Sequence, residues 1–77
     1  MLAAALAPGV RGDAVAPGLV DTAMTKDWTH AHELWRERAP MRRPARPADV
    51  ADLVASVIAS TCLTGEVIPL DGGLNPA

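Results

Sequence analysis

The sequence predicts an α/β fold in which two short parallel strands are joined by a long crossover that contains a helix. Residues 10–16 are interpreted as a short strand that is apolar from Ala14 on and stops at a Pro-Gly pair, which is typical of the end of a strand. Residues 50–58 repeat apolar side chains at helical spacing, and residues 66–70 are interpreted as a second short strand, which a glycine turn closes. A strand, a helical crossover and a second strand make a parallel βαβ unit, which is right-handed by default.

The first helices follow from local composition. Residues 2–7 are rich in Ala and Leu and favour a helix that the next Pro-Gly pair ends. Within residues 26–38, Trp28 and Trp35 stand seven positions apart, so they share a face if this segment is helical. Residues 39–47 form a loop rich in Pro and Arg, because their prolines prevent a continuous helix.

The clearest helix covers residues 47–60. Pro47 suits the first turn, where a missing N–H costs nothing. Asp49 and Asp52 lie near the positive end of the helix dipole. A single apolar stripe runs along the helix and consists of Val50, Leu53, Val54, Val57 and Ile58.

The sequence is expected to form one partial domain, residues 1–77. A domain of this size buries only about 60% of the surface that its unfolded chain exposes. The apolar share is 49%, but it consists of small side chains with Trp28 and Trp35 as the only aromatics. Parallel strands are normally covered by helices and flanked by further strands. Two strands with so little around them predict a fold that is incomplete by itself.

Charge and cysteine content exclude several classes of protein. A net charge of −2 gives no reason to expect nucleic acid or an anionic membrane as a partner. Cys62 is the single cysteine, so we expect no internal disulfide, an inert thiol and a cytoplasmic setting. No run approaches the roughly 18 apolar residues that span a membrane. Residues 1–7 are interpreted as the end of a helix, not as a signal peptide.

Polar residues between the strands allow alternative interpretations. His30 and His32 do not face one another on a helix, so a solvated helix is favoured over a metal site and no metal is predicted. Thr22 either caps the next helix, as Thr25 also can, or contacts a ligand, and these two roles are compatible.

Basic residues concentrate in eleven positions of the same region. They can contact a phosphate or an acidic substrate, but either a solvated loop or pairing of the arginines with Glu33, Glu37 and Asp49 is favoured. The cluster consists of Arg36, Arg38, Arg42, Arg43 and Arg46.

Five segments, in order and at matching spacing, resemble the C-terminal third of a short-chain dehydrogenase/reductase. Residues 17–18 match the Pro-Gly that follows a strand, and residues 19–24 match the cofactor-contacting loop. Residues 43–51 are similar to the family's Arg-x-x-x-Pro-x-Asp/Glu-Val-Ala entry to its last long helix, while residues 64–65 and 70–73 bracket the last strand. The resemblance implies the C-terminal portion of a Rossmann-like, doubly wound parallel sheet.

The resemblance also implies site residues. Pro17 and Gly18 would turn the backbone under the nicotinamide ring of NAD or NADP. Val20 would offer its backbone N–H and C=O to the carboxamide, and Thr22 a hydroxyl to the carboxamide or pyrophosphate. Residues 19–47 would shape the substrate pocket, with apolar walls from Met24, Trp28, Trp35 and Met41.

The catalytic groups of that family are absent from these 77 residues. There is no Gly-x-x-x-Gly-x-Gly for the pyrophosphate, no tyrosine for a Tyr-x-x-x-Lys pair and no matching serine, and Lys26 is the only lysine. No catalytic residue is therefore assigned, and the chain alone is expected to be inactive. The implied function is a fragment of an NAD(P)-dependent enzyme that exchanges hydride with a small carbonyl or alcohol. Truncation, a mis-called start or a broken gene would produce such a fragment.

Two rival hypotheses remain open. In the first, the chain is a non-catalytic docking or oligomerisation module, because the family's last helix and strand commonly form a subunit interface. The stripe at residues 50–58 and the strand Val67–Leu70 would then pair with a full-length relative. In the second, a separate chain supplies the missing part of the enzyme.

Two residues of the first predicted strand depart from the family pattern. Gly12 and Asp13 stand where the family commonly has Val-Asn. A glycine weakens a strand interior. An unpaired carboxylate buried at Asp13 would cost on the order of several kcal/mol, or burial would shift the pKa of the carboxyl group.

Overall fold

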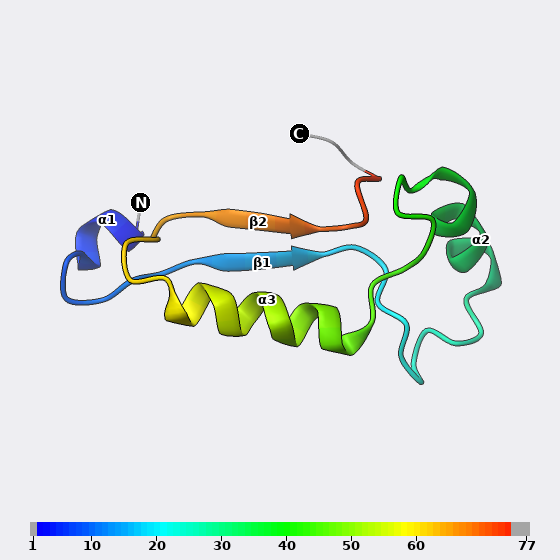
Figure 1. Cartoon of the computed structure of the whole chain (residues 1–77), viewed down its shortest axis with the longest axis horizontal. Helices are drawn as coiled ribbons and strands as arrows, with labels where there is room; N and C mark the ends of the chain where they lie inside the picture. The colour runs from blue at the N-terminus through cyan, green and yellow to red at the C-terminus, as the bar shows by residue number, and fades with distance from the viewer. Residues whose placement is uncertain (1, 75–77) are drawn as a thin grey trace.

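The computed structural model describes residues 2–74 of the chain. Figure 1 shows an open arrangement in which β1 lies between β2 and α3, with α1 at one end of the molecule and α2 at the other. The elements, in chain order, are α1 (Leu2–Leu6), β1 (Ala14–Pro17), α2 (Thr29–Arg38), α3 (Pro47–Ala59) and β2 (Val67–Leu70).

The two strands form the predicted parallel pair. β1 pairs with β2 from Ala14 opposite Val67 to Pro17 opposite Leu70. Both strands consist of continuous apolar residues, as is typical of parallel sheets. The helix α3 lies in the crossover between them and runs beside β1 (Figure 1). The predicted α/β layout is therefore confirmed.

The first strand begins later than predicted. It starts at Ala14, so Gly12 and Asp13 precede it and the cost of a glycine inside a strand does not arise. The Gly12 N–H donates to Thr64 Oγ1 at 3.0 Å, and its carbonyl accepts from the Gly65 N–H at 2.8 Å. These bonds hold the chain beside the entry to β2 before the regular ladder starts.

The Asp13 carboxylate has hydrogen-bond and ionic partners, so it is not the unpaired buried charge that the sequence suggested. Its side chain is only 5% exposed, and Oδ1 accepts the Glu66 N–H at 3.0 Å. The Arg11 guanidinium lies 3.8 Å from Oδ2. The carboxylate thus replaces one rung of the ladder, which explains why an acidic residue is tolerated there.

Side chains cap both ends of α3, one from within the helix and one from a distant residue. At the start, Asp49 Oδ2 accepts the Arg46 N–H at 2.7 Å, so the N-terminal acidic residue acts as predicted. The helix ends at Ala59, one residue before the predicted boundary. There the Arg11 guanidinium donates to the carbonyls of Val57 at 3.1 Å and Ile58 at 2.8 Å, where a cation complements the helix dipole.

The apolar stripe of α3 has little cover among the described residues. Val54 is 40% and Ile58 68% exposed, and Val67 of β2 is 66% exposed. Burial below a tenth is confined, within residues 2–74, to four residues: Ala3, Leu19, Thr25 and Ala39. The prediction that these elements do not complete a core agrees with this distribution. No helix in the same range is long and apolar enough to cross a membrane.

Candidate functional site

An open groove lies where β1 ends and the chain turns toward α2. Its volume is about 440 Å³. It occupies the α2 end of the molecule in Figure 1, at the carboxyl ends of the two parallel strands, where ligands bind in open α/β sheets. It is lined by Gly18, Leu19, Val20, Thr22, Met24, Thr25, Trp28, Ala31 and Trp35.

Gly18 is the residue that lets α2 approach the strand ends. A Cβ at this position would stand 2.7 Å from Trp35 Cζ2 and 3.1 Å from Asp71 Cβ, closer than side chains tolerate. The Gly18 N–H still donates to the Leu70 carbonyl at 3.0 Å, so the strand pairing extends to this point. Trp35 Nε1 donates to the Asp71 carbonyl at 3.1 Å, which fixes the indole beside the glycine.

Val20 presents its backbone polar groups to the groove. It forms an isolated parallel bridge with Ala45, in which the Asp21 N–H donates to Ala45 and the Leu19 carbonyl accepts from Ala45. Because neighbouring backbone groups alternate in direction along extended chain, the N–H and C=O of Val20 point away from Ala45. The carbonyl accepts Thr25 Oγ1 at 2.6 Å, whereas the Val20 N–H has no acceptor within residues 2–74.

Thr25 holds the loop that follows Val20. It is only 5% exposed, and its Oγ1 accepts the Thr22 N–H at 3.0 Å while it donates to Val20. Its carbonyl accepts from His32 Nε2 at 2.9 Å, which ties the loop to α2. The hydroxyls of Thr22 and Thr25 are 3.5 Å apart. The buried Thr25 hydroxyl therefore fixes the backbone at both Val20 and Thr22, which form the polar end of the groove.

The predicted helix caps were wrong. The helix α2 begins at Thr29, three residues later than the predicted segment, and Trp28 occupies its N-cap without a side-chain bond. Thr22 and Thr25 instead close a turn before the helix, because the Thr25 hydroxyl accepts the Thr22 N–H and not an N–H of the first turn of α2. The Thr22 hydroxyl is thus not used for capping and borders the groove.

One face of α2 is apolar, and the charged side chains of the helix lie away from that face. Trp28, Ala31 and Trp35 line the groove together, so the predicted common face of the two tryptophans is confirmed. Glu33 and Arg36, on the same helix, are exposed to solvent. The helix therefore sorts its side chains sharply between groove and solvent.

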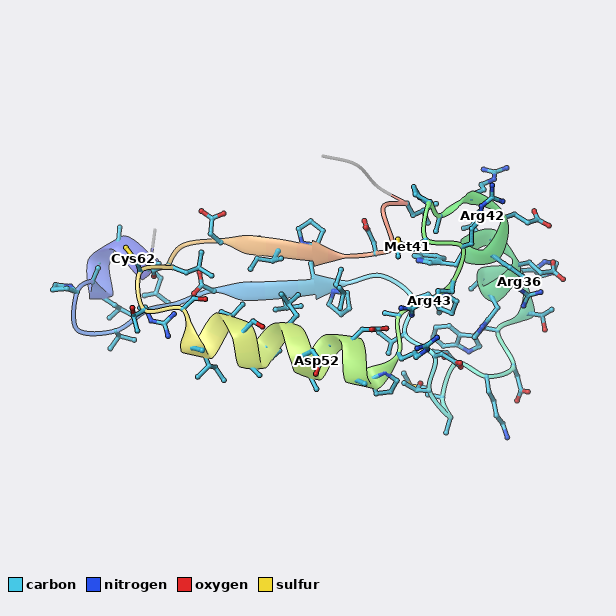
Figure 2. All side chains as sticks on the ribbon, in the orientation of Figure 1. Arg36, Met41, Arg42, Arg43, Asp52 and Cys62 are labelled. Atoms are coloured by element: carbon cyan, nitrogen blue, oxygen red, sulfur yellow. The ribbon has the colours of Figure 1, made fainter. Side chains whose placement is uncertain are left out.

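The structure brings six of the eight predicted site residues into this groove: Gly18, Val20, Thr22, Met24, Trp28 and Trp35. Pro17 is the last residue of β1, opposite Leu70, and does not line the groove. Met41 borders a separate hollow of about 220 Å³ together with Arg43 and Asp52 (Figure 2).

Three groove residues lie within residues 19–47 but were not predicted individually as site residues, namely Leu19, Thr25 and Ala31. The only signal for Thr25 is its spacing of three residues from Thr22, which is typical of a hydroxyl that closes a turn. Ala31 lies three residues after Trp28 and four residues before Trp35, so a helix over this segment puts it on the same face as the two tryptophans.

The arginine cluster is partly paired, as favoured. Arg43 contacts Asp49 Oδ2 at 2.8 Å, and this hydrogen bond, with that from the Arg46 N–H, holds the pKa of the Asp49 carboxyl below its usual range. Arg42 adopts a left-handed conformation, with φ of 61°, and its guanidinium donates to the Glu37 carbonyl at 3.4 Å. Figure 2 shows Arg36 and Arg42 at the α2 end, far from the exposed Cys62.

Comparisons with known proteins identify the family. The family model described as Enoyl-(Acyl carrier protein) reductase matches residues 1–75. A granaticin polyketide synthase putative ketoacyl reductase 2 from Streptomyces violaceoruber is 41% identical over 76 residues, which cover 95% of this chain and 30% of that protein. This chain therefore spans about a third of the length of its relatives.

Solved structures agree with the sequence matches. The short-chain dehydrogenase/reductase, glucose/ribitol dehydrogenase, from Brucella melitensis superimposes with a TM-score of 0.88 at 30% identity, over 99% of this chain and 32% of that one. A small-chain dehydrogenase in complex with NADPH superimposes with a TM-score of 0.82 at 31% identity, over 95% of this chain and 35% of that one. The chain belongs to the short-chain dehydrogenase/reductase family of NAD(P)H-binding oxidoreductases and corresponds to the C-terminal portion of its Rossmann fold.

Proposed function

We propose that this chain supplies one wall of the nicotinamide and substrate pocket of an NAD(P)-dependent oxidoreductase. The observation that carries the proposal is the Val20 N–H, which lacks an acceptor within residues 2–74 and borders an apolar groove beside the Thr22 hydroxyl. A carboxamide needs one donor for its oxygen and one acceptor for its NH₂ group. The Val20 N–H is the donor, and Thr22 Oγ1 is the acceptor.

The residues of this chain bind and orient; they do not deliver protons. The nicotinamide, when bound, supplies or accepts the hydride in exchange with a carbonyl or alcohol. Gly18 and Trp35 form the floor of the groove, and Thr25 holds the Val20 carbonyl so that the N–H side stays directed into it. The proton-transferring tyrosine and lysine must come from outside these residues, since the sequence has no tyrosine. The single exposed Cys62 fits a reducing compartment such as the cytoplasm.

The test is a graft, defined as the NADPH-complexed dehydrogenase with its matched segment replaced by residues 1–77 of this chain. NADPH binding is measured by fluorescence titration for the host, the graft and the isolated chain. We expect the graft to keep NADPH affinity within about tenfold of the host, a difference of about 1.4 kcal/mol. We expect the isolated chain to show no saturable binding and a broad, non-cooperative thermal transition.

Thr22→Val in the graft separates the proposed contact from general packing. We expect it to weaken NADPH binding by about tenfold, the usual cost of one lost hydrogen bond to a ligand. Thr61→Val is the matched control, because Thr61 is exposed in the turn before β2. Equal NADPH affinity for the graft and Thr22→Val, or saturable NADPH binding by the isolated chain, contradicts the proposal.

A second function is favoured by a different surface. The exposed Val54, Ile58 and Val67 lie on α3 and β2, where the resemblance implies a subunit interface. Under this hypothesis the chain is a non-catalytic module that docks on a full-length relative. Sedimentation of the isolated chain with that relative would show a mixed complex that Ile58→Glu removes and that the groove variant Thr22→Val leaves intact.

A further inference from the structure

We propose that the groove selects an uncharged substrate with an apolar ring, an aromatic or alicyclic ketone or the matching alcohol, which lies against Trp28 and Trp35. The proposal rests on the proposed function, because it assigns the polar end of the groove to the nicotinamide. It goes beyond that function by naming the chemical class of the substrate.

The first observation is the exclusion of charge from the groove. None of its nine lining residues carries a charge, although α2 carries charged residues at four of its ten positions. Glu33, Arg36, Glu37 and Arg38 are all exposed to solvent on other sides of the helix. A charged substrate group would lose its hydration here without gaining a partner, which is unfavourable.

The second observation is that the aromatic wall is held in place. The Trp35 indole is bonded through Nε1 to the Asp71 carbonyl, and its ring edge fills the space left by the absent Cβ of Gly18. His32 donates to the Thr25 carbonyl, so α2 is fastened to the loop at a second point. A flat surface that does not have to be ordered on binding favours flat, rigid ligands over flexible chains.

The third observation is the separation of polar and apolar ends. If apolar side chains of another segment filled the groove, the Val20 N–H would be buried without an acceptor, and the Thr22 hydroxyl would keep only its long contact with Thr25 Oγ1 at 3.5 Å. The occupants must therefore offer a polar group at the Val20 end and an apolar surface at the tryptophan end. A carboxamide-bearing ring followed by an apolar ketone satisfies both requirements.

The experiment compares three ketones on the graft and on the host. They are a bicyclic aromatic ketone, a straight-chain ketone with the same number of carbons, and a charged β-ketoacyl thioester of coenzyme A. We expect the graft, relative to the host, to shift kcat/KM toward the bicyclic ketone and away from the thioester by about tenfold, which equals about 1.4 kcal/mol of discrimination. A second graft that carries only residues 18–41 keeps the host's own sheet and should show the same shift.

Variants of the wall give the decisive comparison. Trp28→Ala should raise KM for the bicyclic ketone by about tenfold with little change for the straight chain, as the loss of a stacking partner predicts. Leu34→Ala is the control, because Leu34 is an exposed apolar residue of α2 that does not line the groove. Quenching of Trp28 emission by the bicyclic ketone, measured as the difference between the graft and Trp28→Phe, reports binding without turnover.

The outcomes separate the two proposals. Loss of NADPH binding in both grafts overturns the proposed function. Retained NADPH binding with the charged thioester as the preferred substrate, or with the same KM for the bicyclic ketone in Trp28→Ala and Leu34→Ala, overturns the substrate assignment alone. Retained binding with the expected shift supports both.

Discussion

The region around the groove and the region around the sheet and α3, called here the groove end and the sheet end, differ in how well their side chains are buried and hydrogen-bonded. Around the groove, Leu19, Thr25 and Ala39 are buried, and side-chain hydrogen bonds tie the loop to α2 and α2 to the end of β2. At the sheet end, the apolar side chains of Ile58 and Val67 remain largely open to solvent. The same short chain thus carries one region with buried, hydrogen-bonded residues and one region whose apolar side chains stay exposed.

This difference explains why the chain can form an ordered groove without a complete core. The loop of the groove is held by hydrogen bonds from Thr25 to residues three and five positions away. Longer links join Gly18 to Leu70, Val20 to Ala45 and Trp35 to Asp71. The sheet is organised by contacts across more than fifty positions, such as Asp13 with Glu66. Long-range contacts carry a larger entropic cost of closure and depend on a packed interior to hold them.

The largest effect is expected where the two regions meet. Gly18→Ala places a Cβ 2.7 Å from Trp35 Cζ2, so the indole or the strand end must move. We expect NADPH affinity of the graft to fall by about tenfold to hundredfold, consistent with an overpacking cost of about 1–3 kcal/mol. Gly9→Ala is the control, since its Cβ would meet only the Leu6 carbonyl at 3.7 Å. An unchanged dissociation constant for Gly18→Ala would remove the link between the glycine and the groove.

Thr25→Val tests whether the groove is locally organised. The substitution removes the bonds to the Thr22 N–H and the Val20 carbonyl in a nearly water-free position. We expect a loss of about 1–3 kcal/mol in NADPH binding, measured by titration, with most of it recovered in Thr25→Ser because the hydroxyl is kept. If Thr25→Ser binds as weakly as Thr25→Val, the hydroxyl is not the cause.

Arg11→Ala tests the sheet end. It removes hydrogen bonds to the carbonyls of Val57, Ile58 and Leu63 at the end of α3. We expect the free energy of unfolding of the graft to fall by about 1 kcal/mol in urea, with NADPH affinity unchanged. Arg38→Ala, at an exposed position of α2, should leave both quantities unchanged. A loss of cofactor binding in Arg11→Ala would show that the two regions are coupled.

The sequence predicted the repeating patterns well and the specific partners poorly. The parallel pair follows from two short strands joined by a helical crossover, and the stripe of α3 and the common face of the tryptophans follow from helical spacing. The start of β1 was missed because Asp13 replaces a ladder bond with a side-chain bond to a residue 53 positions away. Nothing in the local sequence around Asp13 reveals that partner.

The groove was only partly predicted, because the hydrogen-bond partners of its side chains cannot be read from the sequence. The resemblance predicted Val20 and Thr22 as site residues. It did not predict the buried hydroxyl of Thr25, whose two backbone partners are defined only in the folded chain. The helix start was misplaced because Thr25 uses its hydroxyl within its own turn, a competition that propensity alone does not resolve.

The smallest effect concerns the ion pair between Arg43 and Asp49. Hydrogen bonds from Arg43 and from the Arg46 N–H lower the pKa of the Asp49 carboxyl in the folded chain. A lowered folded-state pKa means that the stabilisation is present above the usual carboxyl range and is lost as the pH falls through the folded-state value. Because the pair is exposed, the effect is small and salt weakens it.

Urea unfolding of the graft between neutral and acidic pH measures this contribution. We expect Asp49→Asn to reduce the acid-dependent part of the stability slightly, and Asp52→Asn to leave it unchanged (Figure 2). A larger loss in Asp52→Asn than in Asp49→Asn would show that the pair is not its source.

Amide hydrogen exchange at Val20 tests the central claim most directly. The isotope-labelled graft is followed by nuclear magnetic resonance alone, with NADPH, and with adenosine diphosphoribose, which lacks the nicotinamide. We predict that NADPH slows exchange of the Val20 N–H, that adenosine diphosphoribose does not, and that the Val67 N–H is equally unaffected by both. If NADPH binds while exchange at Val20 stays as fast as in the free protein, this chain does not form the nicotinamide wall.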